Sequence, residues 1–441
     1  NGPSGICLSF MLAGNWPYYT GEPHPADEML TARLHFSTRS GNTRCKLECL
    51  SSGLEGRIGG RPLALLMDQL QHPCVDAGLD VPSLLTWKSV DQHPEHKVID
   101  HIVLGKGQPG GSWQSMDPNV LTISLNRWMS LPDLDIRQWE MFHEKSNACK
   151  TASRISVGTV AAYYKDYVRI KRLEQYFRCE TIVTSVRTVC DPDINCQKKD
   201  YNWIVDGFDK QTGKPFRYRC KRVVLATGTT DLSNQLGIPG ENSQPDWITH
   251  DLIKYSILAI ELEERQIINP ILVIGAGLSA ADAIMAARFR GIPVLHAFRD
   301  SSNEWNKLQG LPSSMYPEYH KVYEMMADGG FTGNENDFNN TTGSEKQPIV
   351  TFSDPDGCIH TFRVSTVAIL IGYKPDLSYL KDNGIGLGKY SDKPIDGKSN
   401  PIDVDNFTYE VAKASKNGLY ALGPLVGDNF VRYILGGAFA I

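Results

Sequence analysis

The chain has 441 residues, of which 41% are hydrophobic and 22% charged, an ordinary globular composition that excludes disordered and fibrous proteins. Its 45 basic and 50 acidic residues give a net charge of −5 at pH 7, which argues against nucleic-acid binding. No run approaches the roughly 20 apolar residues needed to cross a bilayer, and the ten scattered cysteines are typical of a reducing compartment, so we expect a cytoplasmic protein.

The first residues have the pattern of a phosphate-binding turn. Gly2 and Gly5 stand as the second and third glycines of such a turn, and an apolar helix is expected over residues 6–12. Because a strand and a first glycine normally precede this turn, we expect the sequence to begin inside the motif. A short strand is expected over residues 17–20. Glu22 then falls where a carboxylate would meet an adenosine ribose, with a surface carboxylate as the alternative.

A second pair of glycines follows an expected strand at 102–104. Gly110-Gly111-Ser112-Trp113 would let the backbone pass close to a flat ring system, with the tryptophan stacked on it. The alternative is a surface turn with a packed aromatic side chain. Further along, paired strands are expected at 201–205 and 216–220, and they lead into a buried strand and small-residue turn at 222–228.

The clearest dinucleotide signal lies in the middle of the chain. A buried strand at 270–274, the turn Gly275-x-Gly277-x-x-Ala280, a helix at 281–289 and a strand at 293–298 form a complete βαβ unit. Such a turn lets a pyrophosphate approach the free N–H groups of the helix N-terminus; the alternative is a tight turn without a ligand. Arg299 ends the second strand, where a guanidinium fits the 2′-phosphate of NADP. A solvated surface arginine is the alternative.

The C-terminal part contains further elements of the same kind. The polar segment 328–347 is expected to be a mobile surface loop, and a buried strand is expected at 364–372. A strand-like run at 418–423 precedes Asp428, which would hydrogen-bond a sugar-alcohol chain or, alternatively, cap the final helix. The apolar helical pattern at 436–441 has no polar end, so we expect a fragment trimmed at both ends.

These patterns predict an α/β fold with two dinucleotide-binding (Rossmann-like) domains, the NADP domain being inserted into the FAD domain. We expect residues 1–245 to form the first part of the FAD domain, without its first strand. Residues 246–366 are expected to form the NADP-binding domain, and residues 367–441 the C-terminal part of the FAD domain.

With these features assembled, the chain resembles the two-dinucleotide flavoproteins, and more closely the oxidative stress-induced growth inhibitor family. The phrases NGPSGICLSFML at residues 1–12 and GLYALGPLVGDNFVRYILGGA at residues 418–438 carry the closer resemblance. It spans essentially the whole chain. The resemblance implies a monooxygenase that uses FAD, NADPH and dioxygen and is linked to growth control, cell death and cytokinesis.

The resemblance also implies two sets of cofactor-binding residues. The set for FAD is Gly2, Pro3, Ser4, Gly5, Glu22, Gly111, Trp113, Thr227 and Asp428. The set for NADP is Gly275, Gly277, Ser279, Ala280 and Arg299. No metal is expected, because no cluster of His, Cys and carboxylate residues has the spacing of a zinc site.

The signature that flavin monooxygenases carry between the Ala-Thr-Gly turn at 226–228 and the glycine turn at 275–280 is incomplete here. Only Ile238-Pro239-Gly240 and Trp247-Ile248-Thr249-His250 match it. His250 is the candidate catalytic residue, with a helix-capping or core histidine as the alternative. The incomplete signature keeps two further hypotheses open: an NADPH oxidase that releases hydrogen peroxide, and a regulatory flavoprotein that acts through protein partners.

Overall fold

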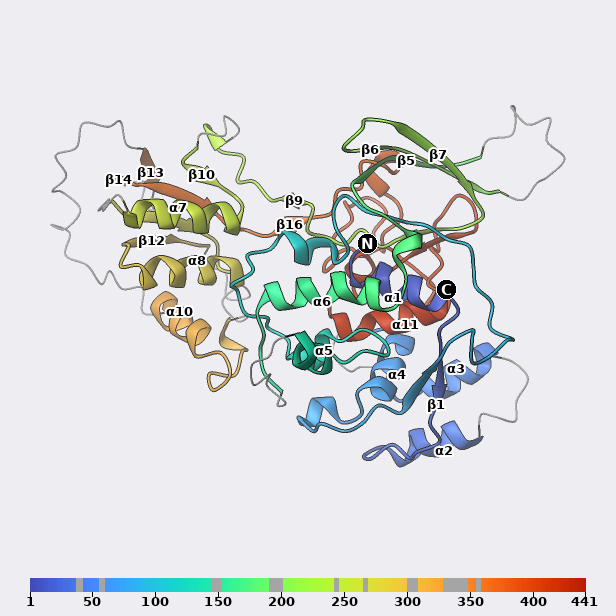
Figure 1. The fold of residues 1–441 in the computed structure, drawn as a ribbon. Coiled ribbons are helices and arrows are strands. Elements are labelled where there is room, and N and C mark those ends of the chain that lie inside the picture. The colour runs from blue at the N-terminus through green and yellow to red at the C-terminus, as the bar shows by residue number, and fades with distance from the viewer. Residues whose placement is uncertain are drawn as a thin grey trace. The chain divides into compact units, whose positions relative to one another are not determined.

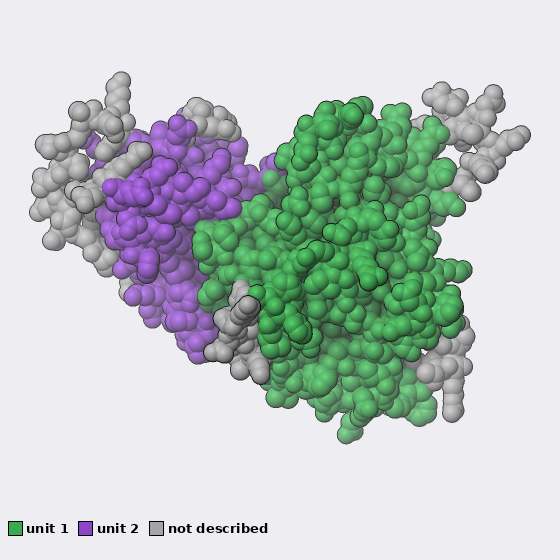
Figure 2. Space-filling view, viewed as in Figure 1, with its two compact units in different colours: residues 1–231, 375–441 green, residues 232–374 purple. Residues whose placement is uncertain are grey.

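The computed structural model describes residues 1–36, 43–54, 60–143, 152–189, 201–241, 246–264, 269–299, 308–327, 348–353 and 358–441 (Figure 1). The chain divides into two compact units (Figure 2). Unit 1 consists of residues 1–231 and 375–441, and unit 2 of residues 232–374. Unit 2 is therefore an insertion in the sequence of unit 1.

Unit 2 is built around a parallel sheet whose strands lie in the order β10-β15-β11-β12. The two central strands, β11 (Ile271–Ile274) and β15 (Thr366–Ile369), are almost entirely apolar and buried, as in a parallel sheet covered on both faces. From β11 the chain passes through α8 (Leu278–Phe289) to β12 (Val294–Ala297), and this confirms the predicted βαβ unit. The fourth strand is β10 (Ile248–Thr249).

Helices and a hairpin complete unit 2. The helices α7 (Leu252–Glu264) and α10 (Pro317–Ala327) both pack against α8 (Figure 1). The antiparallel strands β13 (Ile349–Ser353) and β14 (Ile359–Arg363) bring apolar side chains onto the sheet. Because successive strand residues point to opposite faces, alternate positions of β11, β12 and β15 meet these side chains. The resulting cluster contains Leu272, Ile274, Leu295, Val350, Phe352, Phe362, Val367 and Ile369.

The limits of unit 2 differ from those expected from the sequence. The chain enters the unit along β9 (Leu232–Ser233) and leaves it along β16 (Tyr373–Lys374). These two strands form an antiparallel pair, and both belong to unit 2. Unit 2 therefore extends from residue 232 to residue 374, whereas the sequence predicted limits of 246 and 366. The loop expected at 328–347 lies outside the described residues.

Three helices pack together within the core of unit 1. The first, α1 (Pro3–Leu12), begins after an extended glycine with proline in its first position, where a missing N–H costs nothing. It packs against α11 (Ile434–Ala440), which in turn packs against α4 (Pro62–Gln71) (Figure 1). A Cβ at Gly436 would lie 2.4 Å from the Cα of Ala64, so α11 and α4 approach closely at a glycine.

Two short parallel strand pairs lie beside α1. One joins β3 (Val103–Leu104) to β4 (Phe177–Arg178). The other joins β8 (Val223–Leu225) to β17 (Leu419–Ala421). The second pair links the part of unit 1 that precedes unit 2 to the part that follows it.

The other strands of unit 1 are antiparallel. The strands expected at 201–205 and 216–220 are confirmed as parts of β6 (Trp203–Asp209) and β7 (Pro215–Cys220), which form a sheet with β5 (Thr181–Thr188). The short strand expected near residues 17–20 is β1 (Trp16–Tyr19). Its partner is the antiparallel β2 (Leu85–Lys88).

The helices α2 (Glu28–Phe36), α3 (Thr43–Ser51), α5 (Ile136–His143) and α6 (Val157–Ile170) complete unit 1. Ser156 caps α6 by accepting a hydrogen bond from the N–H of Thr159. Buried tyrosines along α6 donate to backbone carbonyls of residues 129–134 and so fix that segment; they are Tyr163, Tyr164 and Tyr167.

Candidate functional site

The N-terminus of α1 lies against the second pair of glycines in unit 1. The N–H of Gly110 donates to the carbonyl of Asn1 at 2.9 Å. Gly110 and Gly111 have φ angles of 119° and 61°, a region that favours glycine. A Cβ at Gly111 would lie 2.8 Å from the Cα of Gly2, so no side chain fits there. The fold thus brings together two glycine turns that are far apart in the sequence.

Two more segments surround the first turn of α1. A Cβ at Gly423, which follows β17, would lie 2.5 Å from the Oγ of Ser4. A Cβ at Gly5 would lie 4.0 Å from the Cβ of Ala226, which follows β8. The first N–H groups of a helix have no acceptor inside it and carry the positive end of its dipole. We call this arrangement the cradle, made of residues 2–5, 110–111, 226 and 423; its chemistry favours an anion.

Asp428 is a buried carboxylate with an unused acceptor. The residue is 2% exposed. Its Oδ2 accepts a hydrogen bond from the Tyr409 hydroxyl at 2.9 Å, whereas Oδ1 has no hydrogen-bond partner among the described residues. Burial raises the pKa of Asp428 to about 6, against the opposing effects of the Arg61 charge and the Tyr409 hydrogen bond. A hydroxyl of a bound molecule would satisfy this buried oxygen.

Asp428 is linked to the cradle through the turn after β17. Its N–H donates to the carbonyl of Gly423 at 3.2 Å. The alternative role as a helix cap is not observed, because Phe430 and Tyr433 occupy the N-cap positions of the short helix η10 (Val431–Tyr433) and of α11. Asp428 therefore caps neither of these helices.

Two other residues expected at this site lie in the segments that form the cradle. Trp113 follows Gly111, is half-buried, and packs edge-to-face on Tyr164 with ring centroids 6.0 Å apart. The hydroxyl of Thr227, the residue after Ala226, lies 3.0 Å from the hydroxyl of Tyr379.

Glu22 lies on an exposed turn after β1. Its N–H donates to the Oγ1 of Thr20 at 3.3 Å, and its carbonyl accepts from the hydroxyl of Tyr19. These described hydrogen bonds are local, and none of them joins Glu22 to the cradle.

The second glycine turn connects β11 to α8 in unit 2. Gly275 has a φ of 138°, and a Cβ there would lie 2.3 Å from the carbonyl oxygen of Leu370, so this position requires glycine. Gly277 is the extended N-cap residue of α8, and nothing lies within 4 Å of its Cβ position. Ala280 is buried and faces Gly275. The turn is tight, and the end of α8 is open beside Gly277.

The other residues expected to bind NADP lie at the same edge of the sheet. Ser279 is half-buried in the first turn of α8, and Arg299 is exposed just after β12. Between them, the Nε2 atom of His296 lies 2.7 Å from the carbonyl oxygen of Gly275. Burial lowers the pKa of His296, which keeps the ring neutral and able to hold the turn.

His250 is paired with a buried carboxylate in unit 2. Its Nε2 lies 2.8 Å from the Oε1 of Glu241, a residue that is 2% exposed. Glu241 also accepts hydrogen bonds from the backbone N–H groups of Leu236, Gly237 and Ile238. Burial raises the pKa of Glu241, but these hydrogen bonds and that of His250 outweigh it and lower the pKa. The pair holds the segment 236–241 against β10.

Sequence reasoning missed three contributors to the unit 1 site. Gly423 carried a signal, since it is a glycine at the end of an expected strand. Arg61 and Tyr409 carried none, because they come from distant segments. The Arg61 guanidinium donates to the carbonyl of Val426 at 3.0 Å and lies 5.6 Å from the centroid of the Tyr409 ring. Tyr409 itself is fully buried.

Two kinds of feature are absent from the described part of the chain. No helix there is long and apolar enough to pass through a membrane. No group of three or more His, Cys, Asp or Glu side chains within the same residues could hold a metal ion.

The fold, with one glycine turn before α1 and another before α8, defines an α/β protein in which one compact unit is inserted into the other. Bacillithiol disulfide reductase from Bacillus cereus has a similar fold, with a TM-score of 0.53 at 18% identity over 78% of this chain and 90% of the reductase. The enzyme of the same name from Staphylococcus aureus gives a TM-score of 0.53 at 17% identity, over the same shares of the two chains. No family model matches the chain.

Relatives of known name identify the family. Oxidative stress-induced growth inhibitor 1 of Mus musculus is 40% identical over the whole chain and 92% of its own length. Oxidative stress-induced growth inhibitor 2 of Homo sapiens is 37% identical over the whole chain and 91% of its own length. The chain belongs to the oxidative stress-induced growth inhibitor family.

Proposed function

We propose that the chain is a flavoprotein monooxygenase that binds FAD in unit 1 and NADPH in unit 2. The observation that carries the proposal is the buried Oδ1 of Asp428, which has no hydrogen-bond donor among the described residues and adjoins the cradle. The relatives are named growth inhibitors induced by oxidative stress, which supports a role in the control of growth. In this proposal the role extends to cell death and cytokinesis and is exerted in the cytoplasm.

In this proposal the FAD pyrophosphate lies on the first turn of α1. The backbone of Gly2, Pro3, Ser4 and Gly5 binds it, since a helix N-terminus in a glycine-lined cradle is a ready anion site. Asp428 accepts a hydroxyl of the ribityl chain through Oδ1. Gly111, Trp113 and Thr227 lie near the flavin rings, and Glu22 holds the adenosine ribose.

NADPH is assigned to the end of α8. Gly277 admits the pyrophosphate because nothing occupies the space around its Cβ position. Gly275 and Ala280 keep the strand and helix close enough for the N–H groups of α8, with Ser279 beside them, to face the ligand. Arg299 binds the 2′-phosphate and so favours NADPH over NADH.

When bound, FAD would supply the redox chemistry, which is acceptance of hydride from NADPH and activation of dioxygen for transfer of one oxygen atom to a substrate. The chain binds and orients the cofactors and keeps water from the reacting groups. The bond between His250 and Glu241 favours a positioning role for His250 over the catalytic role. It holds the segment 236–241 near the entry to unit 2.

The test is a reduction experiment on the purified protein supplied with FAD. Under anaerobic conditions we expect NADPH to bleach the visible flavin absorbance quickly and NADH to bleach it slowly. Asp428→Asn should weaken FAD binding about tenfold, which corresponds to about 1.4 kcal/mol, because it removes the charge of the acceptor. The exposed Asp392→Asn serves as the matched control.

Each other outcome selects a different function. No flavin binding at saturating FAD would overturn the assignment of the cradle. Bound flavin that NADPH cannot bleach would leave a regulatory flavoprotein that acts through protein partners. Hydrogen peroxide equal to the NADPH consumed, in the presence of amine and sulfide substrates, would identify an NADPH oxidase.

A further inference from the structure

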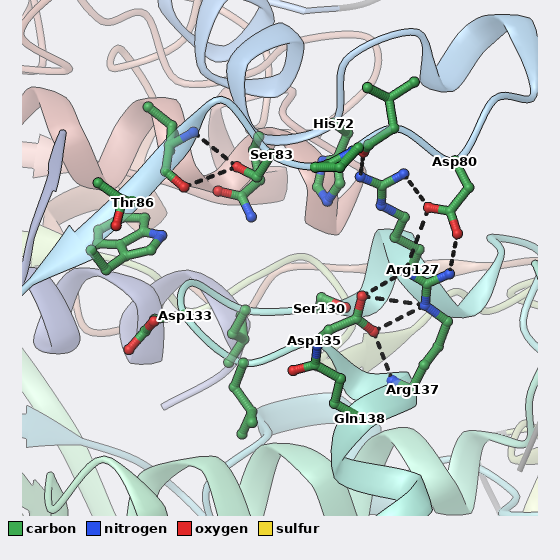
Figure 3. A pocket seen from close by; sticks show the side chains of 17 residues that line it. His72, Asp80, Ser83, Thr86, Arg127, Ser130, Asp133, Asp135, Arg137 and Gln138 are labelled. Carbon is green, nitrogen blue, oxygen red and sulfur yellow. Dashed lines mark hydrogen bonds and ion pairs between the residues drawn. The ribbon is translucent and has the colours of Figure 1, made fainter. Parts of the chain in front are cut away.

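Unit 1 contains a cavity of about 510 Å³ that is separate from the cradle (Figure 3). Its lining residues come from the end of α4, the segment 80–87 that leads into β2, and the segment 127–138 that leads into α5. Trp87, one of them, packs edge-to-face on Phe10 with ring centroids 5.4 Å apart. Phe10 lies about 9 Å along α1 from Ser4, so the cavity adjoins the far half of that helix.

Two largely buried arginines, Arg127 and Arg137, converge on one carboxylate at the edge of this cavity. The Nη1 of Arg127 lies 2.5 Å from Asp80 Oδ1, and the Nη1 of Arg137 lies 2.6 Å from Asp80 Oδ2 (Figure 3). The arginine side chains are 11% and 15% exposed, whereas that of Asp80 is 53% exposed. The cations are therefore fixed in the protein, and the anion between them is at the surface.

The charges around the cavity balance only while Asp80 is in place. Arg137 also pairs with Asp135 at 2.7 Å, and Asp133 pairs with Lys171 at 2.7 Å. Without Asp80, the cations Arg127, Arg137 and Lys171 face only the carboxylates of Asp133 and Asp135. One positive charge then remains. Burial lowers the pKa of Arg127 despite the nearby Asp80 charge. The pKa of Arg137 is raised, first by its hydrogen bond with Asp135.

We propose that this cavity is a binding site for a small molecule with a phosphate or carboxylate group, and that Asp80 is an internal carboxylate which the ligand displaces. With Asp80 displaced, the Nη1 groups of Arg127 and Arg137 would donate charge-assisted hydrogen bonds to the oxygens of either group. The Nη2 of Arg127 stays on the Val81 carbonyl and that of Arg137 on Asp135. The hydroxyl-bearing side chains of Ser83, Thr86 and Ser130 also line the cavity and bind the polar body of the ligand. The site is independent of the proposed flavin chemistry.

The competing account is that Asp80 only fastens the segment before β2 to the two arginines. The two accounts differ in what an added anion does. A displaceable Asp80 competes with phosphate, so removing its charge strengthens phosphate binding. A purely structural Asp80 stabilises the fold, and its removal lowers stability without creating a phosphate site.

The experiment measures inorganic phosphate binding by calorimetry on the FAD-saturated protein at constant ionic strength. Saturation with FAD keeps phosphate out of the cradle. We expect Asp80→Asn to bind phosphate about tenfold more tightly than the wild type, in line with the strength of charge-assisted hydrogen bonds. Adding Arg137→Gln to Asp80→Asn should abolish that gain, and the exposed Asp91→Asn should bind as the wild type does.

Amide hydrogen exchange of the wild type gives a second readout that needs no variant. Displacement of Asp80 should speed exchange in residues 76–83 when phosphate is added, and acetate should act in the same way if carboxylates are also accepted. Phosphate binding by Asp80→Asn no tighter than that of Asp91→Asn would overturn the proposal. So would unchanged exchange in residues 76–83 at saturating phosphate.

Discussion

Lys106 and Asp376 form an ion pair of 3.0 Å in unit 1, and the same ammonium group lies 3.1 Å from Asp231. Asp231 is the last residue of unit 1 before unit 2, and Asp376 is the second residue after the chain re-enters unit 1 at Pro375. One lysine thus binds the segment that leaves unit 1 and the segment that re-enters it. The pKa of Asp376 is lowered, first by its hydrogen bond with Ser378 and further by Lys106.

We expect Lys106→Met to lower the free energy of unfolding by about 1 kcal/mol or less, because the lysine is half-exposed and water screens its charge. The loss should shrink as salt concentration rises, since salt weakens exposed ion pairs. Thermal unfolding at low and high salt measures this effect, with the exposed Lys416→Met as the control. A loss that does not change with salt would argue for a packing role of the side chain.

The buried carboxylate of Asp428 predicts a dependence of stability on pH. The pKa of this carboxyl group is about 6 in the folded protein, whereas an aspartate in the unfolded chain has a pKa of 3.8. The folded state holds its proton after the unfolded state has lost it, so stability falls as pH rises from about 4 to about 6, by about 3 kcal/mol. Asp428→Asn removes this dependence. Relative to the wild type, the variant should therefore be more stable at higher pH than it is at lower pH.

Urea unfolding of the FAD-free proteins at about pH 4.5, inside the window set by the two pKa values, and at about pH 7.5, above it, measures most of that shift. The deficit in FAD affinity of the same variant relative to the wild type should be larger at the higher pH, where the wild-type carboxylate is ionised. An equal difference in stability at both pH values would mean that Asp428 is not shielded from water as the structure shows.

Tyr409→Phe tests how Asp428 is positioned. Removing the hydroxyl takes away the one described donor to the carboxylate, so the pKa of Asp428 should rise further and FAD binding should weaken about tenfold near neutral pH. The quenching of FAD fluorescence on binding, followed as a function of pH, separates the two effects. The exposed Tyr390→Phe is the matched control. Unchanged FAD affinity across the pH range would remove Tyr409 from the site.

The two glycines of the second turn should respond differently to the same substitution. Gly275→Ala forces a Cβ against the Leu370 carbonyl at a φ of 138°, so we expect unit 2 to lose about 2–3 kcal/mol of stability. Gly277→Ala meets no atom within 4 Å at a negative φ, so it should cost less than Gly275→Ala, only the small loss of replacing an N-cap glycine by alanine. It should still weaken NADPH binding, because the methyl group occupies the approach to α8. Equal destabilisation by both substitutions would contradict the described turn.

The sequence predicted the helices and strands whose apolar residues and turn residues are contiguous in the chain. The βαβ unit around Gly275 follows from a run of apolar residues, a glycine turn and a helix, and all three are contiguous in the sequence. The pairing of β1 with β2 could not be predicted, since the partner strand lies far along the chain. The limits of unit 2 depend likewise on the pairing of β9 with β16.

The site was predictable where glycines mark it and not where side chains meet across the fold. Gly2, Gly111 and Asp428 stand in recognisable turns. Tyr409 reaches Asp428 only because the residues between β16 and β17 fold back onto the core, and no sequence period signals such an irregular segment. Arg61 approaches the Tyr409 ring from the segment just before α4, and nothing in the sequence links these two residues.

The division of unit 1 into two stretches of sequence sets the order in which the protein can mature on the ribosome. Unit 2 is continuous, so it has all its strands before residues 375–441 are synthesised. Unit 1 is complete only when α11 covers α1 and α4, and the proposed FAD site is complete only when Asp428 has been added. A chain whose synthesis stops between residues 375 and 441 would therefore have a complete unit 2 and an uncovered apolar core in unit 1. Such a core is a substrate for chaperones and proteases.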